Sequence, residues 1–277
     1  MRFPIRQKIA LLIVLPTVLI LLMVFAIAGH KFQKRSTEDV ERQMTELAWR
    51  YANQFDGHLR EAAQLARSTA AAMEVYSNST PENLFQLMEQ TFKHNQLLFG
   101  VGLAFQPGAF QGKDRFGVFV YYDETGALKR SEIGSESYDY TEEKWEWWHA
   151  PQKAGTGVWT DPYFDSGTGT VLMSTYSVPF YNKEGEFQGV AFADLALEPL
   201  RQLVDSRIAS DLNFTILTQS GKYVFHEDPT KILNDSIFDK AKQIGSEEAM
   251  QFCVELTSGK SGLLKFRDLE TEEEQWI

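Results

Sequence analysis

The chain lacks most of the residue patterns that support catalysis or metal binding. A single cysteine, Cys253, permits neither an internal disulfide nor a cysteine metal cluster. The five histidines are scattered, and the sequence has no phosphate-binding glycine loop, dinucleotide fingerprint, serine-hydrolase elbow or zinc-protease motif. Residues 165–169 begin like a calcium loop, but Tyr176 stands where that loop needs glutamate, so we interpret them as a connection between strands. We therefore expect no cofactor and no metal.

Basic residues are scarce after position 35. Six of the 27 lysines and arginines precede the first acidic residue, Glu38, which leaves 21 basic and 38 acidic residues, a net charge of −17, in 36–277. Such a body repels a phosphate backbone, so we expect no nucleic-acid partner. Aromatic residues, in contrast, make up 13% of the chain and supply ample apolar area for a folded core.

One long apolar run lies near the N-terminus. Residues 9–29 carry no charge over 21 positions, and as a helix they would span about 31 Å, the thickness of a bilayer core. A cleaved signal peptide is the alternative, because 26–28 resemble a cleavage site, although signal-peptide apolar regions are shorter. We therefore predict a cytoplasmic tip and transmembrane anchor over 1–35, in the inner or plasma membrane, with the acidic remainder on the extracytoplasmic, periplasmic side.

Residues 36–75 predict a long stalk helix. The segment has no proline, and apolar residues recur at steps of three or four from Val40 to Met73, with charged residues on the other faces. Two helices broken near Gly57 are the alternative. In either case the stripe indicates a packing or homodimer surface rather than a ligand site.

From about residue 95 the apolar pattern is typical of strands. Residues 123–126 and 182–185 are turn signals between such runs. A helix followed by antiparallel strands in hairpins is typical of an α+β fold. We expect strands at 97–105, 116–122, 171–178 and 187–195 in a first sheet, a connecting helix at 199–208, strands at 214–217, 222–225 and 262–266 in a second unit, and a helix at 246–257.

The strongest local signal is a cluster of aromatic residues beside an acid. Four of the six tryptophans, at 145, 147, 148 and 159, lie within fifteen residues, with tyrosines around them and Asp165 nearby. Three tryptophans within four positions cannot share one face of a helix or strand. An aromatic core explains some of these residues. A box for a cationic ligand, in which each ring face contributes about 0.5–2 kcal/mol and a carboxylate supplies the counter-charge, would explain others.

The motifs around this cluster resemble those of bacterial double Cache sensor domains. The resemblance is carried by 147–151 (Trp-Trp-His-Ala-Pro), 158–165 (Val-Trp-Thr-Asp-Pro-Tyr-Phe-Asp), 173–181 and 189–194, and it extends into 221–226 and 258–262. Such domains are the extracytoplasmic sensors of chemoreceptors, histidine kinases, diguanylate cyclases and phosphatases. The motifs at 158–165 and 173–181 are most similar to those of sensors joined to HAMP and PP2C-type phosphatase modules. The resemblance implies two tandem PAS-like sheets, a membrane-distal, ligand-binding one in 76–200 and a membrane-proximal one in 201–277. We expect the second to be incomplete, with no output domain.

In the amino-acid-binding branch of that family, a Tyr, an Arg-x-Trp-Tyr, a Tyr-x-Asp and a late Asp hold the ligand. Carried over by motif, the resemblance implies ligand-binding roles for Tyr140, Trp145, Trp147, Trp148, Tyr163, Asp165 and Asp194. Trp145 stands at the arginine position, which removes the partner of a ligand carboxylate but keeps the partners of an ammonium group. Lys144, one position away, would restore a cation if the register slipped.

We therefore predict a small-molecule sensor for an amine or quaternary ammonium compound, without catalytic residues, that signals as a homodimer through the long helix. A sensor for an amino acid or carboxylate is one alternative. A second is a catalytic ectodomain with Asp165 and Asp194 as paired acids, for which the sequence offers no nucleophile or metal set. A third is a tethered binding module without signalling, and the sequence that follows Ile277 would distinguish it.

Overall fold

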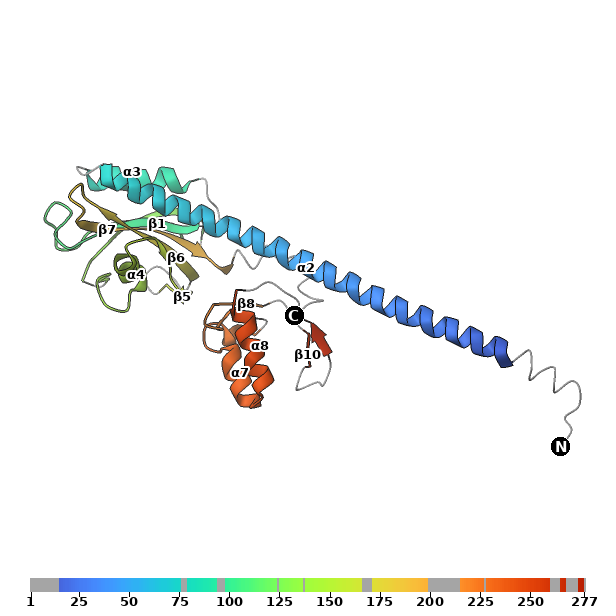
Figure 1. The fold of residues 1–277 in the computed structure, drawn as a ribbon. Helices are drawn as coiled ribbons and strands as arrows, with labels where there is room; N and C mark the ends of the chain where they lie inside the picture. Colours follow the sequence, from blue (N-terminus) through green and yellow to red (C-terminus); the bar gives the residue numbers. More distant parts are fainter. Residues whose placement is uncertain are drawn as a thin grey trace, which may run out of the picture. The chain divides into compact units, whose positions relative to one another are not determined.

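A single long helix forms the N-terminal part of the protein. The structure, a computed structural model, describes residues 15–75, 79–93, 98–123, 125–136, 138–165, 171–198, 215–226, 228–259, 265–267 and 274–276. Helix α2 (Leu15–Val75) has 61 residues and runs through Gly57 without a break, which confirms the prediction of one helix (Figure 1). Within the described chain, α2 is the one helix whose length and composition suit a membrane span.

The central element is an antiparallel sheet of seven strands, in the order β3-β2-β1-β7-β6-β4, with β5 paired to β6. Its strands are β1 (Leu98–Phe105), β2 (Gly117–Tyr122), β3 (Leu128–Ile133), β4 (Val158–Trp159), β5 (Tyr163–Phe164), β6 (Leu172–Tyr181) and β7 (Phe187–Ala196). The predictions for β1, β2, β6 and β7 are confirmed to within a few residues, and β3, β4 and β5 are additional strands. The α+β class is likewise confirmed.

Two polar side chains close the predicted hairpins. The Asp123 carboxylate accepts hydrogen bonds from the backbone N–H groups of Thr125 and Ala127, which turns the chain from β2 into β3. The Asn182 side-chain oxygen accepts from the N–H groups of Glu184 and Glu186 between β6 and β7. Such Asx contacts explain why these sequences act as turn signals.

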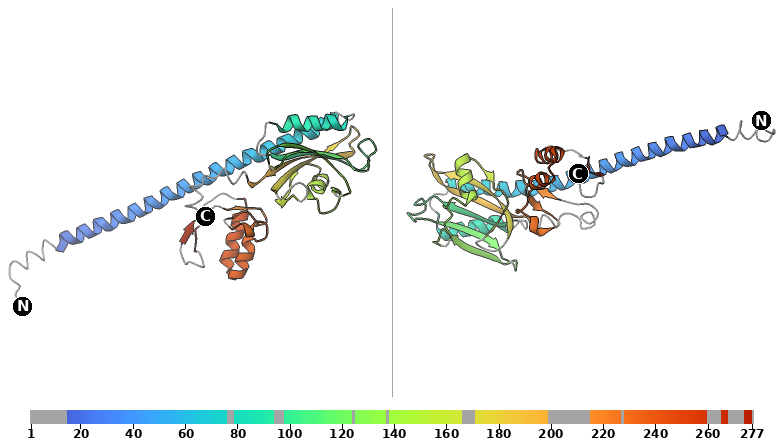
Figure 2. Two further views of the ribbon diagram at one scale, coloured as in Figure 1. Left: turned by 180° about the vertical axis from the view of Figure 1, so that it is seen from behind. Right: turned by 90° about the horizontal axis from the view of Figure 1, so that it is seen from below.

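Helices cover both faces of the sheet (Figures 1 and 2). One face packs against α2 and α3 (Pro81–Phe92), whose first turn is capped by the Thr80 hydroxyl. The α2 side of this core is built of small residues, Ala62, Ala63, Ala66 and Ala70, so the helix can lie close to the sheet. The other face packs against α4 (Glu146–Ala154) and a second aromatic core.

The remaining described elements follow in the C-terminal third. Strands β8 (Ile216–Leu217) and β9 (Tyr223–Phe225) pair in antiparallel fashion, and so do β10 (Lys265–Arg267) and β11 (Glu274–Trp276). Three described helices lie in the sequence between β9 and β10: the short 3₁₀ helix η2 (Pro229–Lys231), α7 (Ile237–Ile244) and α8 (Glu247–Thr257). Helix α8 matches the predicted helix at 246–257. The predicted connecting helix at 199–208 and most of the loop at 165–169 lie outside the described residues.

Candidate ligand-binding site

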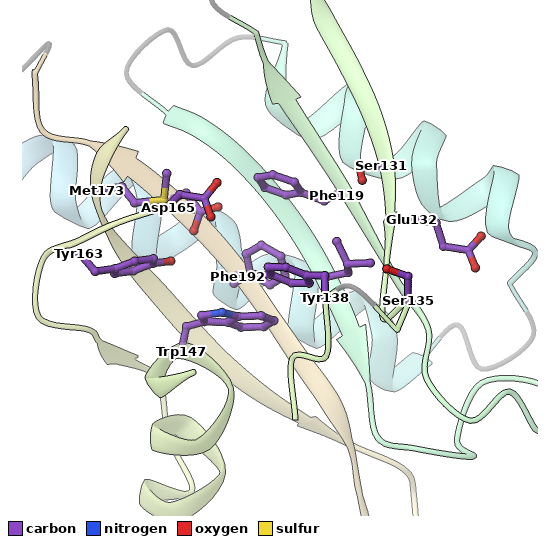
Figure 3. A pocket seen from close by; sticks show the side chains of 12 residues that line it. Phe119, Ser131, Glu132, Ser135, Tyr138, Trp147, Tyr163, Asp165, Met173 and Phe192 are labelled. Atoms are coloured by element: carbon purple, nitrogen blue, oxygen red, sulfur yellow. The ribbon is translucent and has the colours of Figure 1, made fainter. Parts of the chain in front are cut away.

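A cavity of about 190 Å³ lies on the α4 face of the sheet. It is lined by residues of β2, β3, β6 and β7, of the segment between β3 and α4, of α4 itself, and of β5 and the residue that follows it (Figure 3). Its lining consists of Phe119, Ser131, Glu132, Ile133, Ser135, Tyr138, Trp147, Tyr163, Asp165, Met173, Phe192 and Asp194. The volume suits a small organic molecule rather than a polymer.

Two glycines of β1 make room for the apolar floor of this cavity. A Cβ atom at Gly100 would lie 2.5 Å from the Phe119 ring, and one at Gly102 would lie 2.4 Å from the Phe192 ring. Strand β1 is hydrogen-bonded to β2 on one side and to β7 on the other, so it cannot move away. The two phenylalanine rings therefore lie directly on bare backbone.

The deepest polar group is the carboxylate of Asp194 on β7, whose residue is 5% exposed. The Thr175 hydroxyl, on the neighbouring strand β6, donates to Asp194 Oδ1 at 2.7 Å. The Tyr163 hydroxyl lies 2.7 Å from Thr175 Oγ1. Since a threonine hydroxyl has one proton and Thr175 gives it to Asp194, Tyr163 donates to Thr175. The three side chains form a hydrogen-bond chain from the cavity wall to the buried acid.

Thr175 is itself held by a buried polar network. Its backbone N–H donates to Thr160 Oγ1 at 3.0 Å, and the neighbouring Ser174 hydroxyl donates to the Thr160 carbonyl at 2.9 Å. Thr160, Ser174 and Thr175 are all buried. Because buried polar groups are costly to leave unpaired, these contacts hold the backbone of β6 in place at Thr175.

The surroundings make Asp194 a weak acid. Burial raises its pKa to about 7, the Thr175 hydrogen bond opposes that change, and the nearby charge of Asp165 adds to it. Burial also raises the pKa of Tyr163 and of Tyr138, reinforced by the two carboxylates, so both phenols stay protonated. The cavity concentrates negative potential, and a bound cation would favour the ionised form of Asp194.

The lining contains the carboxylates of Asp165 and Asp194 and several aromatic rings, whereas the Glu132 carboxylate at its edge pairs with Lys113, and none of the described lining residues is Lys, Arg or His. Lys144 does not supply the missing cation, because its ammonium pairs with Glu142 and lies 5.0 Å from the centre of the outer Trp145 ring. Within the described chain, no group of three or more His, Cys, Asp and Glu residues could hold a metal. The arrangement is suited to an organic cation, which ring faces attract and carboxylates neutralise.

Four of the predicted ligand-binding residues, Trp147, Tyr163, Asp165 and Asp194, come together around the cavity. The other three, Tyr140, Trp145 and Trp148, are not part of its lining.

Each of these three makes contacts within the aromatic core. The Tyr140 hydroxyl donates to the Phe105 carbonyl at 2.7 Å and accepts from Phe116 N–H at 3.1 Å. Trp148 packs edge-on against Phe187, and Trp145 packs against Tyr138. The helical phase of α4 separates Trp147 from Trp148, as expected for adjacent tryptophans.

Sequence reasoning missed most of the remaining lining of the cavity. Phe119 on β2 and Phe192 on β7 resemble ordinary core residues, and Tyr138 and Ser135 lie in an irregular segment without periodicity. One signal was available: two glycines at alternate positions of a buried strand, at 100 and 102, indicate a close approach on one face.

Comparison with known proteins agrees with this architecture. Residues 84–202 match the family model of the first PDC sensor domain of methyl-accepting-chemotaxis-protein-like receptors. The methyl-accepting chemotaxis protein PscA of Pseudomonas syringae pv. tomato is 24% identical over 148 residues, 53% of this chain and 23% of that protein. The chain thus spans less than a quarter of this curated relative.

Solved structures show the same fold. An extracellular domain assigned to a histidine kinase, soHK1S-Z6, is 29% identical with a TM-score of 0.65, covering 79% of this chain and 81% of that one. The ligand-binding domain of the amino acid chemoreceptor PctC of Pseudomonas aeruginosa PAO1, in complex with GABA, is 20% identical with a TM-score of 0.54, covering 73% and 81%.

Fold and comparisons together support a chemoreceptor-like extracellular sensor domain of the α+β class. Residues 84–202 are more particularly similar to the first PDC sensor domain of chemoreceptor-like proteins. The resemblance to Cache-type sensors is thereby confirmed, and the relatives are sensor domains of chemoreceptors and histidine kinases.

Proposed function

We propose that this chain is the extracytoplasmic sensing region of a bacterial transmembrane receptor and that its cavity binds an amine or quaternary ammonium compound. The supporting observation is the composition of the wall: Asp165, Asp194 and aromatic rings, with no basic residue among its described members. PctC binds GABA, which carries both an ammonium and a carboxylate group. Here the described lining offers carboxylates and ring faces to the ammonium but no cationic side chain to a carboxylate, so an ordinary amino acid would find only neutral hydroxyl and indole donors for its negative charge.

The proposal includes an arrangement in the membrane. The apolar start of α2 anchors the chain in the inner membrane over 1–35, 36–75 forms the stalk, 76–200 the ligand-binding subdomain and 201–277 the membrane-proximal one. Large apolar side chains are exposed along this first part of α2, such as Phe25 at 72% exposure, and they support contact with lipid. Two copies would associate through the long helix, and the region would bind its ligand without transforming it.

Isothermal titration calorimetry of the full chain in nanodiscs tests the ligand class. We expect tetramethylammonium or ethylammonium to bind and GABA to bind at least about tenfold more weakly, since the latter buries a carboxylate without a cationic partner. Binding of GABA without binding of either amine would contradict the proposal, as would recovery of a chemically altered ligand.

A matched pair of variants links binding to the cavity. Asp194→Asn keeps the shape of the side chain but removes the charge, so binding should weaken by about tenfold or more. Asp161→Asn removes an exposed carboxylate from the same part of the chain and should leave binding unchanged. An equal effect of both variants would show that general charge, not the cavity, attracts the cation.

A further inference from the structure

Adjacent residues of β6 face the two sides of the sheet. Thr175 lies on the cavity side, where it contacts Asp194 and Tyr163. Tyr176 lies on the opposite side, in the core shared with α2. Because successive side chains of a strand alternate, a movement of the backbone at this point displaces both side chains together.

Tyr176 is held firmly in place. It is 4% exposed, and its ring packs against Trp159 on β4 with 5.1 Å between ring centres. Its hydroxyl occupies the space over Gly157, where a Cβ atom would come within 2.4 Å. The ring therefore has little freedom to adjust unless the strand itself shifts.

Arg67 of α2 meets this tyrosine in two ways. Its guanidinium donates a hydrogen bond to the Tyr176 hydroxyl, and it lies over the ring with 4.9 Å from Cζ to the ring centre. A hydrogen bond depends steeply on distance and angle, so it defines the position of the helix along the strand.

The neighbouring helix contacts have a different character. Ala62, Ala63, Ala66 and Ala70 present methyl groups to the sheet. Methyl contacts are non-directional and change little in energy when a helix slides by a fraction of an ångström. The energy of the Arg67–Tyr176 contact therefore depends on the position of α2 along the strand, whereas the energy of the alanine contacts hardly does.

We propose that Arg67 is the positioning residue that couples occupancy of the cavity to the long helix, through Tyr176 and the adjacent Thr175. A cation that draws on Asp194 alters its hydrogen bond with Thr175, β6 adjusts at 175–176, and α2 follows through Arg67. The ligand part rests on the proposed function, whereas the mechanical link between β6 and α2 does not.

Hydrogen exchange of the full chain in nanodiscs tests the link with tetramethylammonium as the probe. In the wild type, the probe should change amide protection in α2 around residues 62–75. Arg67→Met, which keeps the apolar stem, should still bind the probe with a Kd within about tenfold of wild type but lose this change. Tyr176→Phe, which removes one hydroxyl, should behave likewise. Arg60→Met is the matched control, because Arg60 is exposed and pairs with Asp56 on its own helix.

The proposal would be overturned if the probe changed protection of α2 in Arg67→Met and Tyr176→Phe as much as it does in the wild type. Equal loss of the change in Arg60→Met would also overturn it.

A second experiment needs no ligand. Thr175→Val removes the hydroxyl that meets Asp194, so it should alter protection of α2 in the wild-type background and not in the Arg67→Met background. Thr175→Ser, which retains the hydroxyl, should have no effect in either. If no amine binds but this pattern holds, the ligand class is wrong and the coupling stands. If amines bind but the pattern is absent, the coupling is wrong.

Discussion

Thr175 and Asp194 are directly paired across strands β6 and β7, and the threonine hydroxyl lies 2.7 Å from the aspartate carboxylate. The pairing places a hydrogen-bond donor beside an acid that is otherwise surrounded by aromatic rings and by Asp165. The balance between burial, which disfavours the charge, and this donor, which favours it, sets the acid's response to pH.

Stability should fall with rising pH because of Asp194. Its pKa is about 7 in the folded protein against 3.8 when unperturbed, so the folded state holds the proton more tightly. The resulting stabilisation is complete below pH 3.8 and is lost as pH rises through 7. Denaturant unfolding should therefore show Asp194→Asn to be more stable than wild type at pH 8, by on the order of 2–4 kcal/mol, with a smaller difference at pH 5. The same difference at both values would contradict this assignment.

Ligand binding should have the opposite dependence on pH. A cation prefers ionised Asp194, so Kd for tetramethylammonium should decrease as pH rises from 5.5 and level off above 7, with a slope of up to about tenfold per unit. Calorimetry in buffers of different ionisation enthalpy should detect proton release at pH 6. A Kd that does not vary between pH 5.5 and 8 would exclude Asp194 as the cation's partner.

Gly102→Ala should disturb the floor of the cavity. The added methyl would meet the Phe192 ring at 2.4 Å and the Val118 carbonyl oxygen at 2.5 Å, so ring or strand must shift. We expect a loss of about 1–3 kcal/mol in the free energy of unfolding, together with weaker binding. Gly57→Ala is the control, because a Cβ atom added at Gly57 in helix α2 would have nothing within 4 Å. This substitution should stabilise the protein by up to about 1 kcal/mol. Thermal melts of both variants measure the contrast.

Tyr140→Phe separates a structural role from a binding role. The lost hydroxyl leaves the Phe105 carbonyl and the Phe116 N–H without their buried partner, which should cost about 1–3 kcal/mol. Since Tyr140 is not part of the cavity lining, Kd for tetramethylammonium should be unchanged at a temperature where the variant is folded. A large loss of affinity without loss of stability would instead support the ligand-binding role that the family motif implies.

The sheet could be predicted because its strands carry local information. Asp123 and Asn182 signal the hairpins in the sequence, and the runs between them are apolar. Helix α4 was missed because three tryptophans and Pro151 give no helical stripe, and its end is marked only by the left-handed Gly155. Helix α3 had a usable signal, a Thr80 cap followed by Pro81 at its first position.

The candidate site was predictable where a motif fixes the residue and unpredictable where packing does. Asp165 directly follows β5 and Asp194 lies on β7, far apart in the sequence, and their proximity depends on β5 and β7 both pairing with β6. Trp147 and Trp148 are chemically alike, and the phase of one helical turn decides which lines the cavity. The position of Tyr138 depends on the path of an irregular segment, whose residues show no hydrophobic periodicity from which that path could be predicted.

The chain of hydroxyls between Tyr163 and Asp194 gives the cavity two chemical faces. When Asp194 is ionised, each proton points inward, and the Tyr163 oxygen presents its lone pairs to the cavity. A proton on Asp194 Oδ1 would make the acid a donor to Thr175, which would then donate to Tyr163, and the phenolic proton would turn outward. A single proton on the Asp194 carboxylate would thus convert Tyr163 from a hydrogen-bond acceptor for an ammonium group into a donor to an oxygen atom of the ligand.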